Sequence, residues 1–143
     1  MLVKHKQMRI ISESPDRTNN IGAEIAAELH PGDIVYLYGE LGSGKTVFVK
    51  GLCRGLGVDE DVTSPSFVIA TEYAGRMKVS HIDLYRLDGP QVDALPLDEY
   101  IPEDGITVIE WADRLTSPEK GIVIRITIID KRSRELIIED LRD

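Results

Sequence analysis

The chain has 143 residues, a length typical of one domain with one core, and we expect a single domain over residues 1–143. Its 25 acidic residues outnumber 17 Lys and Arg, which gives a net charge of −8, whereas proteins that bind nucleic acid directly are usually basic. Cys53 is the single cysteine, which excludes an intrachain disulfide and a metal site built from cysteines. The sequence shows no signal peptide and no apolar run approaching the roughly 18–20 residues of a membrane span, so we expect a cytoplasmic protein without membrane contact.

The first part of the chain predicts two strands that each precede a helix. The expected elements are strands over 8–11 and 34–38 and helices over 15–29 and 45–57. Ser14 is the expected N-cap of the first helix, with Thr18 as a second possibility. Gly57 is expected to end the second helix. The strand over 34–38 is apolar throughout, which is typical of a strand buried on both faces.

A glycine-rich segment, Gly39-Glu40-Leu41-Gly42-Ser43-Gly44-Lys45-Thr46, joins the second strand to the second helix. Strand, glycine loop and helix form the context of a phosphate-binding P-loop, in which backbone N–H groups and the helix dipole face one spot. Lys45 can reach the β- and γ-phosphates, and the Thr46 hydroxyl can ligate Mg²⁺. The sequence therefore predicts a nucleoside triphosphate site; the alternative is an ordinary glycine turn that caps a helix.

The rest of the chain predicts two hairpins and one buried strand. The expected elements are a hairpin of strands over 67–73 and 77–87, short helices and loops over 88–105, a strand over 106–109, and a hairpin of strands over 122–130 and 135–139. The predicted fold is α/β, a single P-loop NTPase-like domain with a mixed parallel and antiparallel central sheet flanked by helices.

Acidic residues at the ends of strands are the candidates for chemistry beside the P-loop. Glu110 directly follows the buried strand, so it could hold Mg²⁺; the alternative is a solvated acid. Asp83 shares a strand face with His81 and Tyr85, and it could orient the attacking water, hold the outer shell of the metal, or form a cross-strand ion pair. A lone histidine such as His81 is more often structural.

Three further segments leave alternatives open. Thr63-Ser64-Pro65-Ser66 could sense the γ-phosphate as a switch segment, or form a turn that begins a strand. Arg86 could pair with a phosphate or with an acid. Lys131, Arg132 and Arg134 belong to a hairpin tip that is either solvated or able to clamp a nucleotide or a partner.

These segments together resemble the TsaE family (older name YjeE), small bacterial P-loop ATPases of the machinery that makes threonylcarbamoyladenosine in tRNA. The matching blocks are Thr18-x-x-Ile21-Gly22, the P-loop, Thr63-Ser64-Pro65-Ser66-Phe67, His81-Ile82-Asp83-Leu84-Tyr85-Arg86-Leu87, Ile109-Glu110-Trp111 and Ser133-Arg134-Glu135. The resemblance implies ATP and Mg²⁺ as cofactors, metal at Thr46 and Glu110, and catalytic roles for Lys45, Asp83 and Glu110. It implies nucleotide contacts at Thr18, Glu40, Leu41, Gly42, Ser43, Gly44, Lys45, Thr46, Val47, Thr63, Trp111 and Arg134.

The resemblance also implies partners, the TsaB and TsaD proteins, of which TsaD transfers the threonylcarbamoyl group to tRNA. We therefore expect an ATPase that is weak alone, is stimulated by TsaB–TsaD, and meets tRNA only through these partners, which suits its acidic charge. Two alternatives stay open: a small-molecule or nucleoside kinase with Asp83 as its base, and a non-catalytic nucleotide sensor. ATP rather than GTP follows from the resemblance and from the lack of a guanine-reading Asn-Lys-x-Asp motif.

Overall fold

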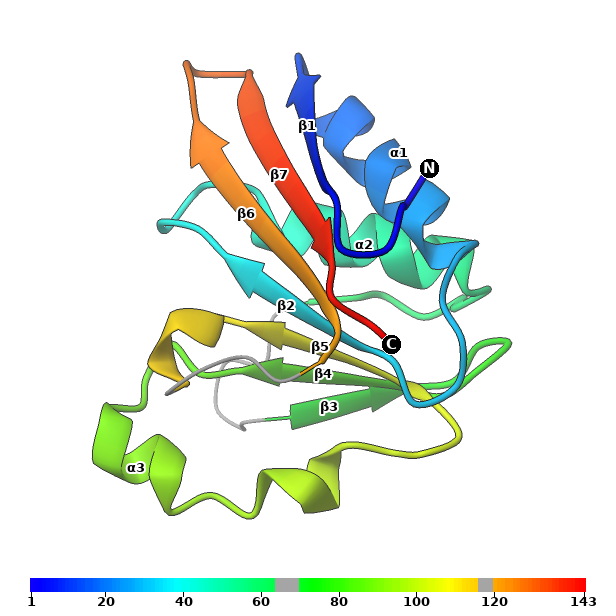
Figure 1. The fold of residues 1–143 in the computed structure, drawn as a ribbon, viewed down its shortest axis with the longest axis vertical. Coiled ribbons are helices and arrows are strands. Elements are labelled where there is room, and N and C mark those ends of the chain that lie inside the picture. The colour runs from blue at the N-terminus through cyan, green and yellow to red at the C-terminus, as the bar shows by residue number, and fades with distance from the viewer. Residues whose placement is uncertain (64–69, 116–119) are drawn as a thin grey trace.

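The computed structural model describes residues 1–63, 70–115 and 120–143 and shows one mixed sheet with the strand order β1-β7-β6-β2-β5-β4-β3 (Figure 1). The strands are β1 (Gln7–Ser12), β2 (Ile34–Tyr38), β3 (Ala70–Tyr73), β4 (Val79–Asp83), β5 (Ile106–Glu110), β6 (Ile122–Ile128) and β7 (Arg134–Asp140). β2 is parallel to β5 and β6, and β4 is parallel to β5. β3 pairs antiparallel with β4, and β7 pairs antiparallel with both β6 and β1. The predicted α/β fold with a mixed sheet is confirmed.

Helices cover both faces of the sheet. α1 (Pro15–Ala26) and α2 (Lys45–Gly55) pack against each other on one face, and α3 (Gly89–Asp93) lies well away from them (Figure 1). Two 3₁₀ turns, η1 (Leu97–Tyr100) and η2 (Ala112–Arg114), complete the helical segments. Val35 and Leu37 of β2 join the core beneath α1 and α2, whereas Tyr36 joins the core on the side of α3, so β2 is buried on both faces as predicted. In the described part of the chain, no helix combines the length and apolarity needed to cross a membrane.

The start of α1 shows which of the two candidate caps the sequence uses. Ser14 is the N-cap, and its hydroxyl accepts a hydrogen bond from the backbone N–H of Arg17 at 3.1 Å. The prediction of Thr18 as a second possible N-cap is wrong, because Thr18 lies inside α1. Its buried hydroxyl instead shares a 2.7 Å hydrogen bond with that of Ser12, which connects α1 to the end of β1.

Several elements end earlier than predicted because the chain turns. β4 ends at Asp83 instead of residue 87, where the Asp83 carboxylate accepts the N–H of Tyr85 at 2.9 Å. β6 ends at Ile128 instead of residue 130, where the Asp130 carboxylate accepts two turn N–H groups. α2 ends at residue 55 instead of 57, and Gly57 follows with a φ of +78°. Residues 67–69 of the predicted third strand lie outside the described residues.

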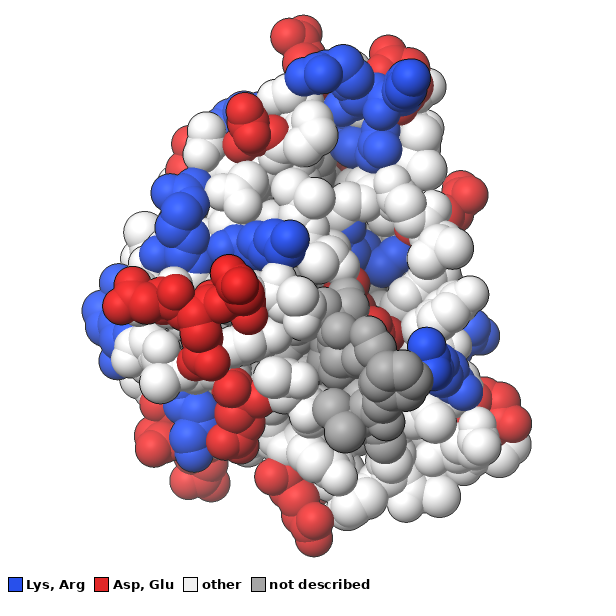
Figure 2. Space-filling view, turned by 180° about the vertical axis from the view of Figure 1, so that it is seen from behind, with Lys and Arg blue, Asp and Glu red and all other residues white. Residues whose placement is uncertain are grey.

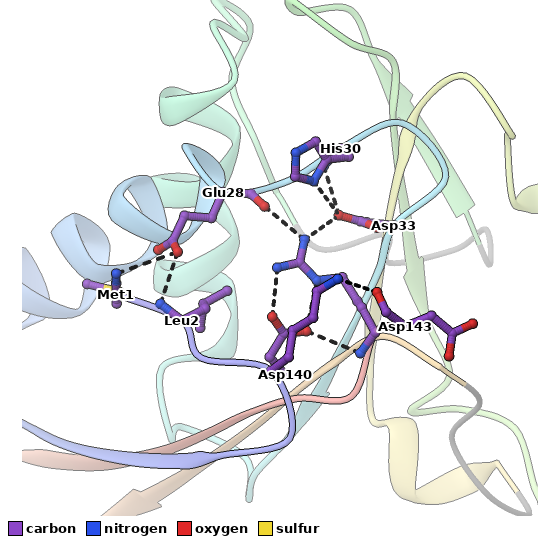
Figure 3. Close-up of polar contacts among 9 residues, drawn as sticks. Met1, Leu2, Glu28, His30, Asp33, Asp140 and Asp143 are labelled. Atoms are coloured by element: carbon purple, nitrogen blue, oxygen red, sulfur yellow. Dashed lines mark hydrogen bonds and ion pairs between the residues drawn. The ribbon is translucent and has the colours of Figure 1, made fainter.

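Polar contacts fasten both ends of the chain to the turn between α1 and β2 (Figure 3). The Arg142 guanidinium binds the carboxylates of Asp140 and Asp33 at 2.7 to 2.8 Å and the Glu28 carbonyl oxygen at 2.8 Å. The Glu28 carboxylate accepts the backbone N–H of Leu2 at 2.9 Å. The contacts around Arg142 make it the centre of a charged cluster that holds the C-terminus in place.

Candidate active site

The segment over 39–46 forms the strand, loop and helix unit that the sequence predicts. Gly42 and Gly44 have φ values of +80° and +104°, a region that residues with side chains rarely adopt. Gly44 immediately precedes α2, so the positive end of the helix dipole faces the loop. The loop is closed by a 3.0 Å hydrogen bond from the N–H of Ser43 to the carbonyl of Glu40. This conformation can bind a phosphate group.

A cavity of about 370 Å³ opens beside this loop, and the predicted acids line it. Its walls are formed by Leu41, Gly42, Gly44, Lys45, Thr46, Val47, Asp83, Tyr85, Glu110 and Trp111. The register of the parallel strands places Glu110 of β5 between Leu37 of β2 and Asp83 of β4. Because these strands are parallel, their carboxyl ends meet at one edge of the sheet. The topology therefore brings the P-loop and both acids together.

Glu110 is buried, and each of its carboxylate oxygens faces a different polar group. Oε2 lies 2.5 Å from Nε2 of His81, a residue of β4 that is 0% exposed. Oε1 accepts a hydrogen bond from the Thr46 hydroxyl over 3.5 Å. The carboxylate is thus oriented by β4 on one side and by the first turn of α2 on the other.

Lys45 points back across the loop and under an aromatic ring. Its Nζ donates hydrogen bonds to the carbonyl oxygens of Gly39 and Glu40 at 2.5 and 2.9 Å, and it lies 4.1 Å from the centre of the Trp111 ring. Burial lowers the pKa of Lys45, and the negative charge of Glu110 opposes this shift. The ammonium group is therefore already held at the loop, next to the cavity.

Asp83 is half-buried at the end of β4. Burial raises the pKa of its carboxyl group, and Glu110 raises it further, whereas the N–H of Tyr85 acts in the opposite direction. A carboxylate with a raised pKa is a better proton acceptor than an exposed one. The Tyr85 ring lies against Trp111 with a centroid distance of 4.8 Å, so two aromatic side chains border the cavity beside Asp83.

Several residues that the resemblance linked to the nucleotide do not line this cavity, and their predicted contacts stay predictions. Thr18 and Arg134 line a neighbouring cavity of about 110 Å³, which shares Gly42, Gly44 and Val47 with the larger one. Thr63 lines a third cavity, of about 520 Å³, and the Tyr73 hydroxyl accepts its N–H at 3.3 Å and donates to its carbonyl at 3.0 Å. The side chain of Glu40 is exposed, and Ser64 to Ser66 lie outside the described residues.

Sequence reasoning missed two contacts of the site. The sequence favoured a hydrogen-bonded structural role for His81, but it did not show that the partner is the candidate metal ligand Glu110. Arg134 donates hydrogen bonds to the carbonyl oxygens of Gly42 and Ser43 in the P-loop. Alternation did place His81 and Asp83 on one strand face, but only the strand order shows what that face meets.

Comparison with known proteins assigns the family. The family model described as "Threonylcarbamoyl adenosine biosynthesis protein TsaE" matches residues 12–136. The chain belongs to the TsaE family. The protein named tRNA threonylcarbamoyladenosine biosynthesis protein TsaE from Treponema pallidum is 37% identical over 134 residues, covering 92% of this chain and 99% of its own. The protein of the same name from Bacillus subtilis is 39% identical over 132 residues, covering 89% of this chain and 83% of its own.

A solved structure shows the same fold. The crystal structure of YdiB from Bacillus subtilis matches with a TM-score of 0.80 and 34% sequence identity, over 95% of this chain and 86% of that one. The predicted resemblance to TsaE is therefore confirmed. The part matched by the TsaE family model contains the P-loop, Asp83, Glu110 and Arg134, so the whole candidate site lies within the family region.

Proposed function

We propose that this TsaE-family chain is a cytoplasmic, ATP-binding and ATP-hydrolysing subunit of the machinery that makes threonylcarbamoyladenosine in tRNA. Its hydrolysis would be coupled to a complex of TsaB and TsaD. One observation carries the proposal: Lys45 and Thr46 of α2, Asp83 of β4 and Glu110 of β5 line one cavity beside a P-loop. The names of the family and of its relatives support the assignment to threonylcarbamoyladenosine biosynthesis.

The residues at the loop fit Mg²⁺ as the ion bound with ATP. Thr46 and Glu110 offer oxygen donors 3.5 Å apart, and Mg²⁺ prefers oxygen ligands from one or two side chains together with phosphates and water. Among the described residues, no cluster of three or more His, Cys, Asp and Glu could hold a metal by itself. When bound, Mg²⁺ supplies positive charge that stabilises the transferring phosphoryl group.

Different residues of the chain would then bind phosphate and accept the proton of the attacking water. The backbone N–H groups of the loop bind phosphate, and Lys45 exchanges its contacts with the Gly39 and Glu40 carbonyls for phosphate oxygens. Asp83 lies in the same cavity and can accept the proton of an attacking water, because burial raises its pKa.

The composition of the cavity supports weak activity in the absence of partners. Among the described residues, none of those lining it is an arginine, and an arginine at the transferring phosphoryl group contributes about 10³–10⁵ in rate. A partner could complete the site. The net charge of −8, and the interspersed basic and acidic side chains on the face shown in Figure 2, suit docking on protein with tRNA held by the partners.

The test is Mg²⁺-dependent ATP hydrolysis by the chain with and without TsaB–TsaD from the same organism, with Lys45→Ala as the inactive control. We expect slow turnover alone, strong stimulation by the pair, and co-elution with it. A folded chain that neither binds the pair nor responds to it contradicts the proposal. Phosphate transfer to a small acceptor would identify a kinase, and ATP binding without turnover in either condition would identify a sensor.

A further inference from the structure

We propose that Arg134 is a positioning residue. It holds the P-loop in its phosphate-binding conformation by hydrogen bonds to carbonyl oxygens of the loop, and it does not contact the phosphate itself. The inference deepens the proposed function, since it rests on phosphate binding by the loop. It does not depend on hydrolysis or on TsaB–TsaD.

The hydrogen bonds of Arg134 carry the inference. Arg134 is the first residue of β7, and its guanidinium donates four hydrogen bonds, all to backbone carbonyl oxygens. Nε binds Ser43 at 3.0 Å and Nη2 binds Gly42 at 3.1 Å, while Nη1 binds Asp130 at 2.7 Å and Ser133 at 2.9 Å. Four of the five N–H donors of an arginine are thus engaged by the backbone.

These contacts fix the direction of two peptide units in the loop. In a trans peptide the N–H points opposite to the C=O of the same unit. Because the carbonyls of Gly42 and Ser43 face Arg134, the N–H groups of Ser43 and Gly44 face away from it. The Ser43 N–H meets the Glu40 carbonyl at 3.0 Å and so closes the loop, while the Gly44 N–H is a donor of the kind with which a P-loop binds phosphate. Arg134 therefore holds both peptide units in the orientation that the loop needs.

The loop needs such support because glycine offers little of its own. Gly42 and Gly44 have positive φ values, and nothing lies within 4 Å of the position that a Cβ on Gly42 would occupy. Glycine peptides rotate more freely than others, so contacts from outside the loop add to the hydrogen bond that closes it between Ser43 and Glu40. The hairpin end is itself closed by the Asp130 carboxylate, which accepts two backbone N–H groups of the turn. Arg134 therefore joins the hairpin end to the glycine-rich P-loop.

A lysine at position 134 cannot form these hydrogen bonds together, so comparing Arg134→Lys with Arg134→Gln separates hydrogen bonding from charge. The ammonium of a lysine keeps the charge, but it lacks the planar fork that reaches Gly42 and Ser43 together with the hairpin carbonyls. If Arg134 acts through the several hydrogen bonds of its planar guanidinium, Arg134→Lys and Arg134→Gln should weaken phosphate binding equally. If Arg134 acts by its charge on phosphate, Arg134→Lys retains most of the function.

The measurement is the affinity for inorganic pyrophosphate by titration calorimetry, on the full chain and without partners. We expect Arg134→Lys and Arg134→Gln each to weaken binding about tenfold or more, since each loses hydrogen bonds from a charged donor. Lys131→Gln removes a charge from the same hairpin without a described contact to the loop, and it should bind within about twofold of wild type. Amide exchange of Ser43 and Gly44 should be faster in both Arg134 variants and unchanged in Lys131→Gln.

Two results would overturn the inference: wild-type affinity in Arg134→Lys with a loss in Arg134→Gln, or wild-type affinity in both. A measurement on the wild-type protein covers the case in which the variants do not fold. In its NMR spectrum, the Nε–H signal of Arg134 should shift little on addition of pyrophosphate, because Arg134 stays on the loop carbonyls. A large shift would instead show direct contact with phosphate and would refute the positioning role.

Discussion

Replacing His81 by phenylalanine tests whether this buried histidine holds the Glu110 carboxylate for a metal. Phenylalanine has a similar shape, so the main change is loss of the 2.5 Å contact between Nε2 and Oε2 of Glu110. A hydrogen bond to a charged group contributes about 1.5–3 kcal/mol, and we expect the free energy of unfolding of the metal-free protein to fall by about that amount. Groups that orient a metal ligand change metal affinity by about 10–100-fold, so the Mg²⁺ concentration for half-maximal effect should rise to that extent.

The assay combines urea unfolding, followed by far-UV circular dichroism, with Mg²⁺ titration of nucleotide affinity. His81→Gln is the matched control, because its amide nitrogen can still donate to Glu110 and should recover part of both effects. A His81→Phe protein with wild-type stability and wild-type Mg²⁺ dependence would refute the reasoning. Lower stability with unchanged Mg²⁺ dependence would show that His81 only supports the fold.

Three further variants test other parts of the structure. Lys45→Ala should weaken nucleotide binding by about 30-fold or more while the domain stays folded, because it removes the loop ammonium; equal affinity by calorimetry would contradict the P-loop assignment. Asp83→Asn should abolish turnover but retain ATP binding, because it removes the proposed base. Burial raises the pKa of Asp83, so wild-type turnover should decline as the pH falls through a value above the ordinary aspartate pKa of about 3.9. Asp140→Asn should lower the free energy of unfolding by about 1.5–3 kcal/mol at pH 7. Hydrogen bonding to Arg142 lowers the pKa of Asp140, so the stability that this carboxylate contributes is present above about pH 4 and is lost on acidification. The free energies of unfolding of wild type and Asp140→Asn, measured by denaturation, should therefore converge at low pH.

Local pattern was sufficient for most of the fold. The apolar run of β2 matched its burial on both faces, and Ser14 followed by proline marked the start of α1. Strand ends were harder to predict, because the side chains of Asp83 and Asp130 bind nearby backbone N–H groups and turn the chain early. Thr18 fitted the composition of a cap equally well, but its pairing with Ser12 depends on where β1 lies.

The sequence predicted the parts of the site that are visible within single strands. Glu110 was recognised because it ends an apolar strand, and Asp83 because alternation places it on one strand face with His81 and Tyr85. That β4 ends at Asp83, and so places this acid beside Glu110, was not predicted. The partner of His81 was not predictable, since the contact depends on β4 lying next to β5 in one particular register. The contact of Arg134 with Ser43 joins residues 91 positions apart and requires β7 to lie beyond β6. Neither adjacency is visible in residue spacing.

The strand order separates the supports of the site into two independent sets. The strands β5 and β4 lie on one side of β2 and carry Glu110, Asp83 and His81. The strands β6 and β7 lie on the other side of β2, and β7 brings Arg134 to the carbonyl oxygens of the loop. The hydrogen bonds of His81 and Arg134 described above have no residue in common, so their effects on Mg²⁺-nucleotide binding should add. In a double-mutant cycle of His81→Phe and Arg134→Lys, we expect the coupling free energy to lie within about 0.5 kcal/mol of zero. The single His81 variant should change the Mg²⁺ requirement, and the single Arg134 variant should change pyrophosphate affinity without metal. A coupling above about 1 kcal/mol would show that the loop transmits strain between the two sides, and it would contradict this division.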